Sequence, residues 1–138
     1  VGSEMCIRDR SPALPLAELL GWADVVSVHA PLNERTRGLI GERELRMMKP
    51  SALLINVARG GIVDEAALAR ALDEEVIAGA AIDVFTREPI AADNPLLAVK
   101  DPDRLLLSPH NAWSPAEAID ALIGLVAENI TNFMEKNK

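Results

Sequence analysis

Four side chains that can bind anions or move protons each follow a short apolar run of this sequence: Arg59, Asp83, Glu88 and His110. Histidine gives and takes a proton near neutral pH, and a carboxylate bonded to its second ring nitrogen would fix its tautomer. A guanidinium can hold a carboxylate through two hydrogen bonds and polarise a neighbouring carbonyl. An arginine, an acid and a histidine in one place would therefore suit hydride transfer between a 2-hydroxy acid and a nicotinamide.

Each of these residues also has a simpler explanation when it is taken alone. Arg59 could be a surface arginine in a strand-to-helix loop, the two acids could be solvated loop charges, and His110 could be structural or merely exposed. Pro89 favours an extended Glu88, whose carboxylate would then project across the edge of a sheet. Only convergence of these side chains would make them a site.

The elements that would position them alternate between apolar runs and amphipathic segments. Strands are predicted at residues 25–28, 52–56, 78–83 and 104–107. Helices are predicted at residues 16–22, 42–48, 64–72 and 114–133. Asp64 would cap the third helix, and residues 114–117 form a capping box for the last one, which has an apolar stripe.

Continuous apolar strands alternating with helices indicate a parallel sheet covered on both faces, which is the Rossmann-type doubly wound α/β architecture. Ligands of such sheets bind outside the carboxyl ends of the strands. The loops after the predicted strands contain residues 29–31, 57–61, 83–88 and 108–111, and each has a polar residue or one of special geometry. This shared placement is the first indication of function.

Composition and spacing disfavour several other classes of protein. The net charge is −7 and the basic residues are scattered, so nucleic acid is not an expected partner. No apolar run is long enough to span a membrane, and the single cysteine, Cys6, allows no internal disulfide. His29 and His110 are far apart in the sequence and there is no Cys/His cluster, so no metal site is predicted. The sequence has no G-x-S-x-G motif that would support hydrolysis by a serine nucleophile. The first ten residues are no secretory signal, and a cytoplasmic location is the default expectation.

Several stretches resemble the D-isomer-specific 2-hydroxyacid dehydrogenase family in order and spacing, from about Leu14 to the C-terminus. They are ADVVSVHAPL at 23–32, TRGLI at 36–40, MKP at 48–50, NVARGGIVDE at 56–65, DVF at 83–85, EP at 88–89 and PH at 109–110. The agreement of several long motifs is far more specific than any one of them.

The resemblance implies a role for each candidate residue. Arg59 would bind the substrate carboxylate, His110 would be the general acid/base and Glu88 would pair with it. Asp83 would lie beside the nicotinamide end of NAD or NADP. The cofactor cleft would be lined by the backbone of Ala30, Val57, Ala58 and Ala112, and His29 would matter through its backbone rather than its ring.

The resemblance also implies a substrate class. The position of Trp113 after His110 resembles the glycerate dehydrogenase (hydroxypyruvate reductase) branch, and the alternative is that Trp113 is only an apolar anchor at the start of the last helix. Trp22 is expected in the core. The expected reaction is reduction of hydroxypyruvate or glyoxylate, or oxidation of D-glycerate, by a homodimeric parent protein. A dinucleotide-sensing interaction protein, like the transcriptional corepressors of the same superfamily, is one alternative, and an inactive truncated product is another.

The sequence departs from the family's pattern at its start. The G-x-G-x-x-G turn that cradles a pyrophosphate should lie upstream of Leu14, as should the residue that separates NAD from NADP, and neither is present. Residues 1–10 match nothing else in the chain and are expected to be foreign. We therefore expect residues 11–113 to be the C-terminal part of the NAD(P)-binding domain, and residues 114–138 to be a helix that packs on a missing substrate domain. The isolated chain is expected to be inactive, and poorly stable or self-associating.

Overall fold

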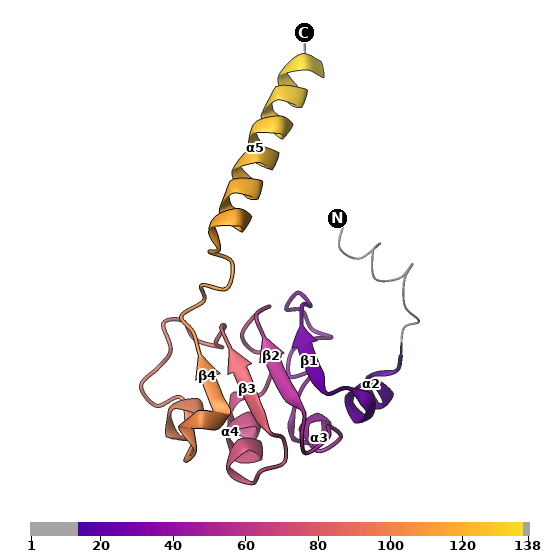
Figure 1. Ribbon diagram of the computed structural model, residues 1–138, viewed down its shortest axis with the longest axis vertical. Helices are drawn as coiled ribbons and strands as arrows, with labels where there is room; N and C mark the ends of the chain where they lie inside the picture. Colours follow the sequence, from indigo (N-terminus) through magenta and orange to yellow (C-terminus); the bar gives the residue numbers. More distant parts are fainter. Residues whose placement is uncertain (1–13, 137–138) are drawn as a thin grey trace.

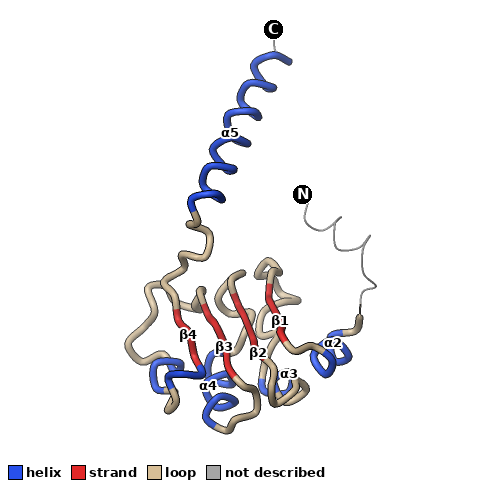
Figure 2. Tube along the Cα trace, in the orientation of Figure 1, coloured by secondary structure: helices blue, strands red, loops and turns tan. Residues whose placement is uncertain are grey.

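The computed structural model describes residues 14–136, so the expectation that residues 1–10 are foreign falls outside the described part (Figures 1 and 2). Its strands are β1 (Val25–Val28), β2 (Leu53–Asn56), β3 (Gly79–Ile82) and β4 (Leu105–Leu107). Its α-helices are α2 (Leu16–Trp22), α3 (Glu42–Leu45), α4 (Glu65–Asp73) and α5 (Ala116–Lys136), and two short 3₁₀ helices, Pro95–Ala98 and Pro102–Arg104, precede β4. Every predicted strand and helix is present, with ends that differ by a few residues.

The four strands form one parallel sheet in the order β1-β2-β3-β4. Their register places Val28 beside Asn56, Asn56 beside Ile82, and Ile82 beside Leu107. All four carboxyl ends therefore lie along one edge of the sheet. The loops that contain the candidate residues leave from this edge, as predicted.

The expectation that both faces of the sheet are covered is wrong for the described residues. Alternate strand residues such as Val26, Leu54 and Ile82 are buried, whereas Val25, Leu53 and Leu106 on the other face are exposed by 52%, 43% and 68%. Consecutive parallel strands joined by right-handed crossovers place every connecting helix on the same face. A second helical layer requires a reversal of strand order, and this sheet has none.

The covered face carries the core. Leu45 of α3 and Leu68 and Leu72 of α4 are fully buried in one cluster with Leu54 of β2. As predicted, Asp64 caps α4, where its carboxylate accepts a hydrogen bond from the Ala67 amide at 2.9 Å. The helix α3 ends three residues earlier than residue 48 because its last turns tighten into bonds between residues three apart, as in Met48 N to Leu45 O at 3.1 Å.

The last helix leaves the sheet and extends away from it (Figure 1). Its apolar stripe is present but exposed, as Ile123, Val126 and Phe133 show with 61%, 49% and 69%. The predicted capping box does not form, and the Ser114 hydroxyl instead donates to the carbonyl oxygen of Asn111 at 2.7 Å. Among the helices of residues 14–136, none combines the length and the apolar composition that crossing a bilayer requires.

The expectation for Trp22 is also wrong. Its side chain at the end of α2 is 74% exposed, whereas Leu20 in the same helix is fully buried. A short amphipathic helix at the edge of a domain buries only one stripe, and Leu20 occupies it.

Candidate active site at the carboxyl edge of the sheet

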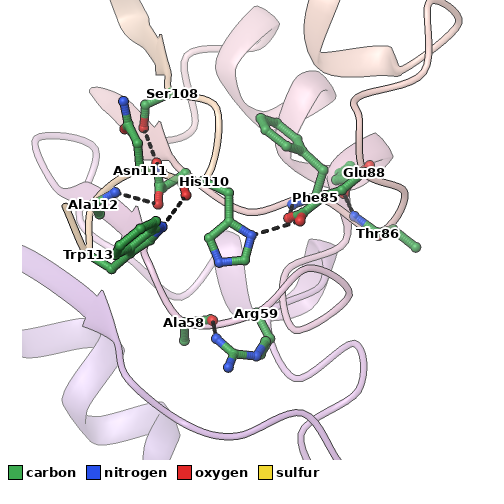
Figure 3. A network of polar contacts seen from close by, with 12 residues as sticks. Ala58, Arg59, Phe85, Thr86, Glu88, Ser108, His110, Asn111, Ala112 and Trp113 are labelled. Carbon is green, nitrogen blue, oxygen red and sulfur yellow. Dashed lines mark hydrogen bonds and ion pairs between the residues drawn. The ribbon is translucent and has the colours of Figure 1, made fainter.

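The histidine that follows β4 contacts the acid that follows β3. His110 Nδ1 lies 2.7 Å from Glu88 Oε2, and both side chains are about one-third exposed. In Figure 3 one nitrogen of the imidazole ring faces Glu88, and the second nitrogen points away from Glu88. The carboxylate holds the Nδ1 proton, so Nε2 is the ring atom available to an external partner.

Glu88 is itself fixed by its own loop. Its second oxygen, Oε1, accepts a hydrogen bond from the Phe85 amide at 2.9 Å. The bond with His110 is the main cause that lowers the pKa of Glu88 below its ordinary value, and the Phe85 amide adds to it. Glu88 is therefore a carboxylate at neutral pH, and it can neutralise positive charge on the imidazole.

The loop that carries Glu88 is anchored to the start of α4. Glu65 accepts hydrogen bonds from the Thr86 amide at 2.6 Å and from the Asn94 side-chain amide at 2.7 Å. Asn94 is buried, and its own carbonyl oxygen accepts from the Leu96 amide at 3.0 Å. One carboxylate thus ties together both ends of residues 86–94.

Asp83 is not a solvated loop charge, because it is 3% exposed and accepts three hydrogen bonds. Its partners belong to the loop that follows β4: the Ser108 hydroxyl at 2.6 Å, the Asn111 amide at 2.9 Å and the Ala112 amide at 3.0 Å. Burial raises the pKa of Asp83, but the bonds from Ser108, Ala112 and Asn111 outweigh burial and leave the pKa below its ordinary value. Residues on both sides of His110 are therefore held by one buried carboxylate.

Arg59 stands in a turn that Asn56 organises. The Asn56 side chain is buried, accepts from the Ala58 amide and donates to the Arg59 carbonyl, both at 3.2 Å. The Arg59 guanidinium donates to the Ala58 carbonyl oxygen at 2.6 Å, which occupies one of its five N–H groups and leaves the others for an anion. Gly61 turns the chain with a φ of 80°, a conformation that glycine adopts readily.

Gly60 permits a close contact between two backbone segments. A Cβ atom built on Gly60 would collide with the Phe85 carbonyl group and with the Thr86 nitrogen. The backbone of the Arg59 turn is thus pressed against the backbone of the Glu88 loop. Only glycine permits this contact, which fixes the position of the turn that carries Arg59 relative to the loop that carries Glu88.

The candidate residues line two cavities. Ala30, Val57, Ala58 and Arg59 line one of about 290 Å³ together with His29, whose Nε2 lies 2.8 Å from the Ser27 hydroxyl. Glu88 and His110 line another, of about 330 Å³. Ala112 lines neither, and its amide is occupied by Asp83. The structure therefore joins Glu88 directly to His110, and it links Arg59 to them through the contact of Gly60 with Phe85.

The first cavity lies at the carboxyl ends of β1 and β2, the edge at which ligands of such sheets bind, and its lining includes the small side chains of Ala30 and Ala58. Asp83 uses three of its roughly four lone-pair positions within the protein, which leaves it one further bond at most. In residues 14–136 no three His, Cys, Asp or Glu side chains are grouped to hold a metal ion.

Three residues of this site were missed by sequence reasoning: Asn56, Glu65 and Ser108. An asparagine at the end of a strand is a known turn former and could have been noticed. Glu65 and Ser108 bond to residues 21 and 25 positions away, and no local pattern indicates such partners.

Comparison with known proteins agrees with this arrangement. A sequence model of the D-isomer specific 2-hydroxyacid dehydrogenase NAD binding domain matches residues 5–112, more than half of the chain. A glyoxylate reductase of Korarchaeum cryptofilum is 46% identical over 120 residues, which are 87% of this chain and 35% of the relative. A glycerate dehydrogenase of Methylorubrum extorquens is 42% identical over 119 residues, which are 86% of this chain and 38% of the relative.

A solved structure extends the likeness to three dimensions. The D-isomer specific 2-hydroxyacid dehydrogenase of Lactobacillus delbrueckii ssp. bulgaricus, in its NAD complexed form, superposes with a TM-score of 0.74 at 30% identity, covering 87% of this chain and 39% of that one. The chain thus spans less than two fifths of the length of each of these three proteins. Its parallel sheet and the match over residues 5–112 show that the chain belongs to the D-isomer-specific 2-hydroxyacid dehydrogenase family, within the NAD-binding domain.

Proposed function

We propose that the chain is the C-terminal part of an NAD(P)-dependent oxidoreductase that interconverts small 2-keto acids and 2-hydroxy acids. The observation that carries this proposal is the contact between His110 Nδ1 and Glu88 Oε2 at 2.7 Å, at the edge of the sheet where dinucleotides bind. Residues 11–113 would complete the cofactor domain, and residues 114–138 would belong to the substrate domain. The exposed apolar stripe of α5 supports this division.

In this proposal, Arg59, His110 and Glu88 each have a separate role in the reduction. Arg59 binds the carboxylate of the keto acid and orients the keto group toward His110. The protonated His110 gives the Nε2 proton to the keto oxygen, and Glu88 keeps the ring oriented and balances its charge. When bound, the reduced nicotinamide supplies the hydride that C2 receives, so the product is a 2-hydroxy acid. Oxidation runs the same transfers backwards, with neutral His110 taking the hydroxyl proton.

The proposed substrates are hydroxypyruvate and glyoxylate in reduction and D-glycerate in oxidation. Relatives named glyoxylate reductase and glycerate dehydrogenase support this class. The full-length enzyme that contains this chain is expected to oxidise NADH or NADPH when hydroxypyruvate or glyoxylate is added, as followed by the absorbance of the reduced cofactor. Pyruvate and oxaloacetate serve as comparison substrates. Tight cofactor binding without turnover of any 2-keto acid would reject the enzyme and favour a dinucleotide-sensing interaction protein.

We further propose that the isolated chain binds the cofactor weakly. Its sequence has no G-x-G-x-x-G turn, so the pyrophosphate would lack the backbone amides that normally hold it. Calorimetric titration of the 138-residue chain with NADH is expected to show no micromolar site, whereas the full-length enzyme titrated in the same way shows one. Micromolar affinity of the isolated chain would contradict this prediction. The homodimeric state of the full-length enzyme stays a prediction.

A further inference from the structure

The backbone of His110 adopts a conformation that needs support. Its φ is 55°, in the left-handed region that residues other than glycine rarely adopt. This conformation costs about 1 kcal/mol for an L-residue and persists where the surroundings enforce it. The direction in which the imidazole leaves the backbone depends on φ, so whatever enforces this φ also aims Nε2.

Contacts around His110 show what enforces it. Asp83 accepts from Ser108 and Ala112, and also from the Asn111 amide, which belongs to the same planar peptide group as the His110 carbonyl. The oxygen of that carbonyl accepts the indole N–H of Trp113 at 2.8 Å, and the two residues are drawn side by side in Figure 3. The His110–Asn111 peptide group is thus held at both of its polar atoms, the N–H by Asp83 and the oxygen by the Trp113 indole.

Trp113 does not act as an apolar anchor in the described part of the chain. Its side chain is 63% exposed, and it stands before α5 rather than under it. The next residue continues the same turn, since both the amide and the hydroxyl of Ser114 donate to the Asn111 carbonyl, at 3.0 and 2.7 Å. Residues 110–114 therefore form a compact turn that the indole closes.

We propose that Trp113 is a positioning residue, whose indole N–H holds the His110 carbonyl and thereby aims the imidazole that pairs with Glu88. This inference rests on the proposed function for its kinetic consequence, but the contact itself is independent of activity. The ring of Trp113 is secondary in this role, and the N–H group is essential. Removal of the N–H should therefore matter even when the shape of the side chain is kept.

The test uses the full-length enzyme with two changes at Trp113. Trp113→Phe removes the N–H and part of the ring, and incorporation of benzothienylalanine, with sulfur in place of the N–H, removes only the donor. Both are expected to lower kcat about two- to tenfold, the effect of one lost hydrogen bond, with an unchanged Kd for NADH. Benzothienylalanine is introduced site-specifically at position 113, and Trp22→Phe, at an exposed position on α2, is the control without effect.

A spectroscopic readout separates this inference from the proposed function. In proton–nitrogen spectra, the Trp113 indole N–H should exchange slowly although its ring is exposed, while the Trp22 indole exchanges fast. The Nδ1 proton of His110, bonded to Glu88, should shift or broaden in both Trp113 variants and stay unchanged in Trp22→Phe. An unprotected Trp113 N–H, or a benzothienylalanine variant with the kcat and the His110 signal of the unmodified enzyme, would overturn the proposal. An enzyme without turnover would reject the proposed function, and these signals would still decide the role of Trp113.

Discussion

Replacing His110 by asparagine in the full-length enzyme is expected to lower kcat by about 10²- to 10⁴-fold, the usual contribution of a positioned acid or base. Asparagine is the suitable substitute because it tolerates the left-handed conformation that His110 adopts, with its φ of 55°. The bonds of Asp83 to Ser108, Asn111 and Ala112 do not involve the imidazole, so the loop should keep its shape. The loss is expected in kcat, with a nearly unchanged Kd for NADH.

Glu88→Gln provides the matched test of the pair. Glutamine has one acceptor oxygen and one NH2 group, so it can accept from the Phe85 amide or from His110 but cannot replace both carboxylate oxygens, and it brings no charge. A charge-assisted bond is also roughly twice as strong as a neutral one. We expect kcat to fall about tenfold or more. Because Glu88 acts only through His110, the double variant should be no slower than His110→Asn alone. Additive losses, or a His110→Asn enzyme with kcat within a few-fold of the unmodified enzyme, would contradict the assigned roles.

Much of this fold follows from local patterns in the sequence. The strand at residues 25–28 and the cap at Asp64 were predicted where the structure has them, because apolar runs and capping side chains act over a few residues. Local patterns could not predict that helices cover only one face of the sheet. This coverage depends on strand order, and the exposed side chains of Val25 and Leu53 are as apolar as buried ones.

Sequence reasoning named the candidate residues but not the contacts that hold them in place. Parallel strands end at one edge, so the rule for ligand binding brought Arg59, Glu88 and His110 to attention before any contact was known. The network beneath them depends on long-range pairs, such as Glu65 with Thr86, and on a close approach of two backbones at Gly60. Side-chain spacing carries no information about either.

The contact of Gly60 with the backbone of Phe85 and Thr86 is expected to be sensitive to substitution. Gly60→Ala in the full-length enzyme is expected to reduce kcat/KM by at least about 100-fold and to lower Tm by several degrees. A methyl group at this position collides with the Phe85 carbonyl and the Thr86 nitrogen, which are backbone atoms and cannot rotate aside. Overpacking of this kind costs about 1–3 kcal/mol, and occasionally more, when the structure shifts to relieve it. The shift must separate the Arg59 turn from the Glu88 loop, and a displacement of about 1 Å in a catalytic group costs about 100-fold in rate.

Glycines elsewhere in the chain provide the controls. Gly21 lies in α2, where an added Cβ would be 3.7 Å from the Met47 carbonyl oxygen, an ordinary contact, so Gly21→Ala should keep full activity and stabilise the helix by about 0.5–1 kcal/mol. Gly61→Ala separates strain from collision, because its φ of 80° is unfavourable for alanine while the nearest atom is 3.8 Å away. It should lower Tm with a smaller loss of kcat/KM than Gly60→Ala. If Gly60→Ala and Gly61→Ala lost equal activity, conformational strain in the turn would explain both, and the contact with Phe85 would not be what places Arg59 beside the Glu88 loop.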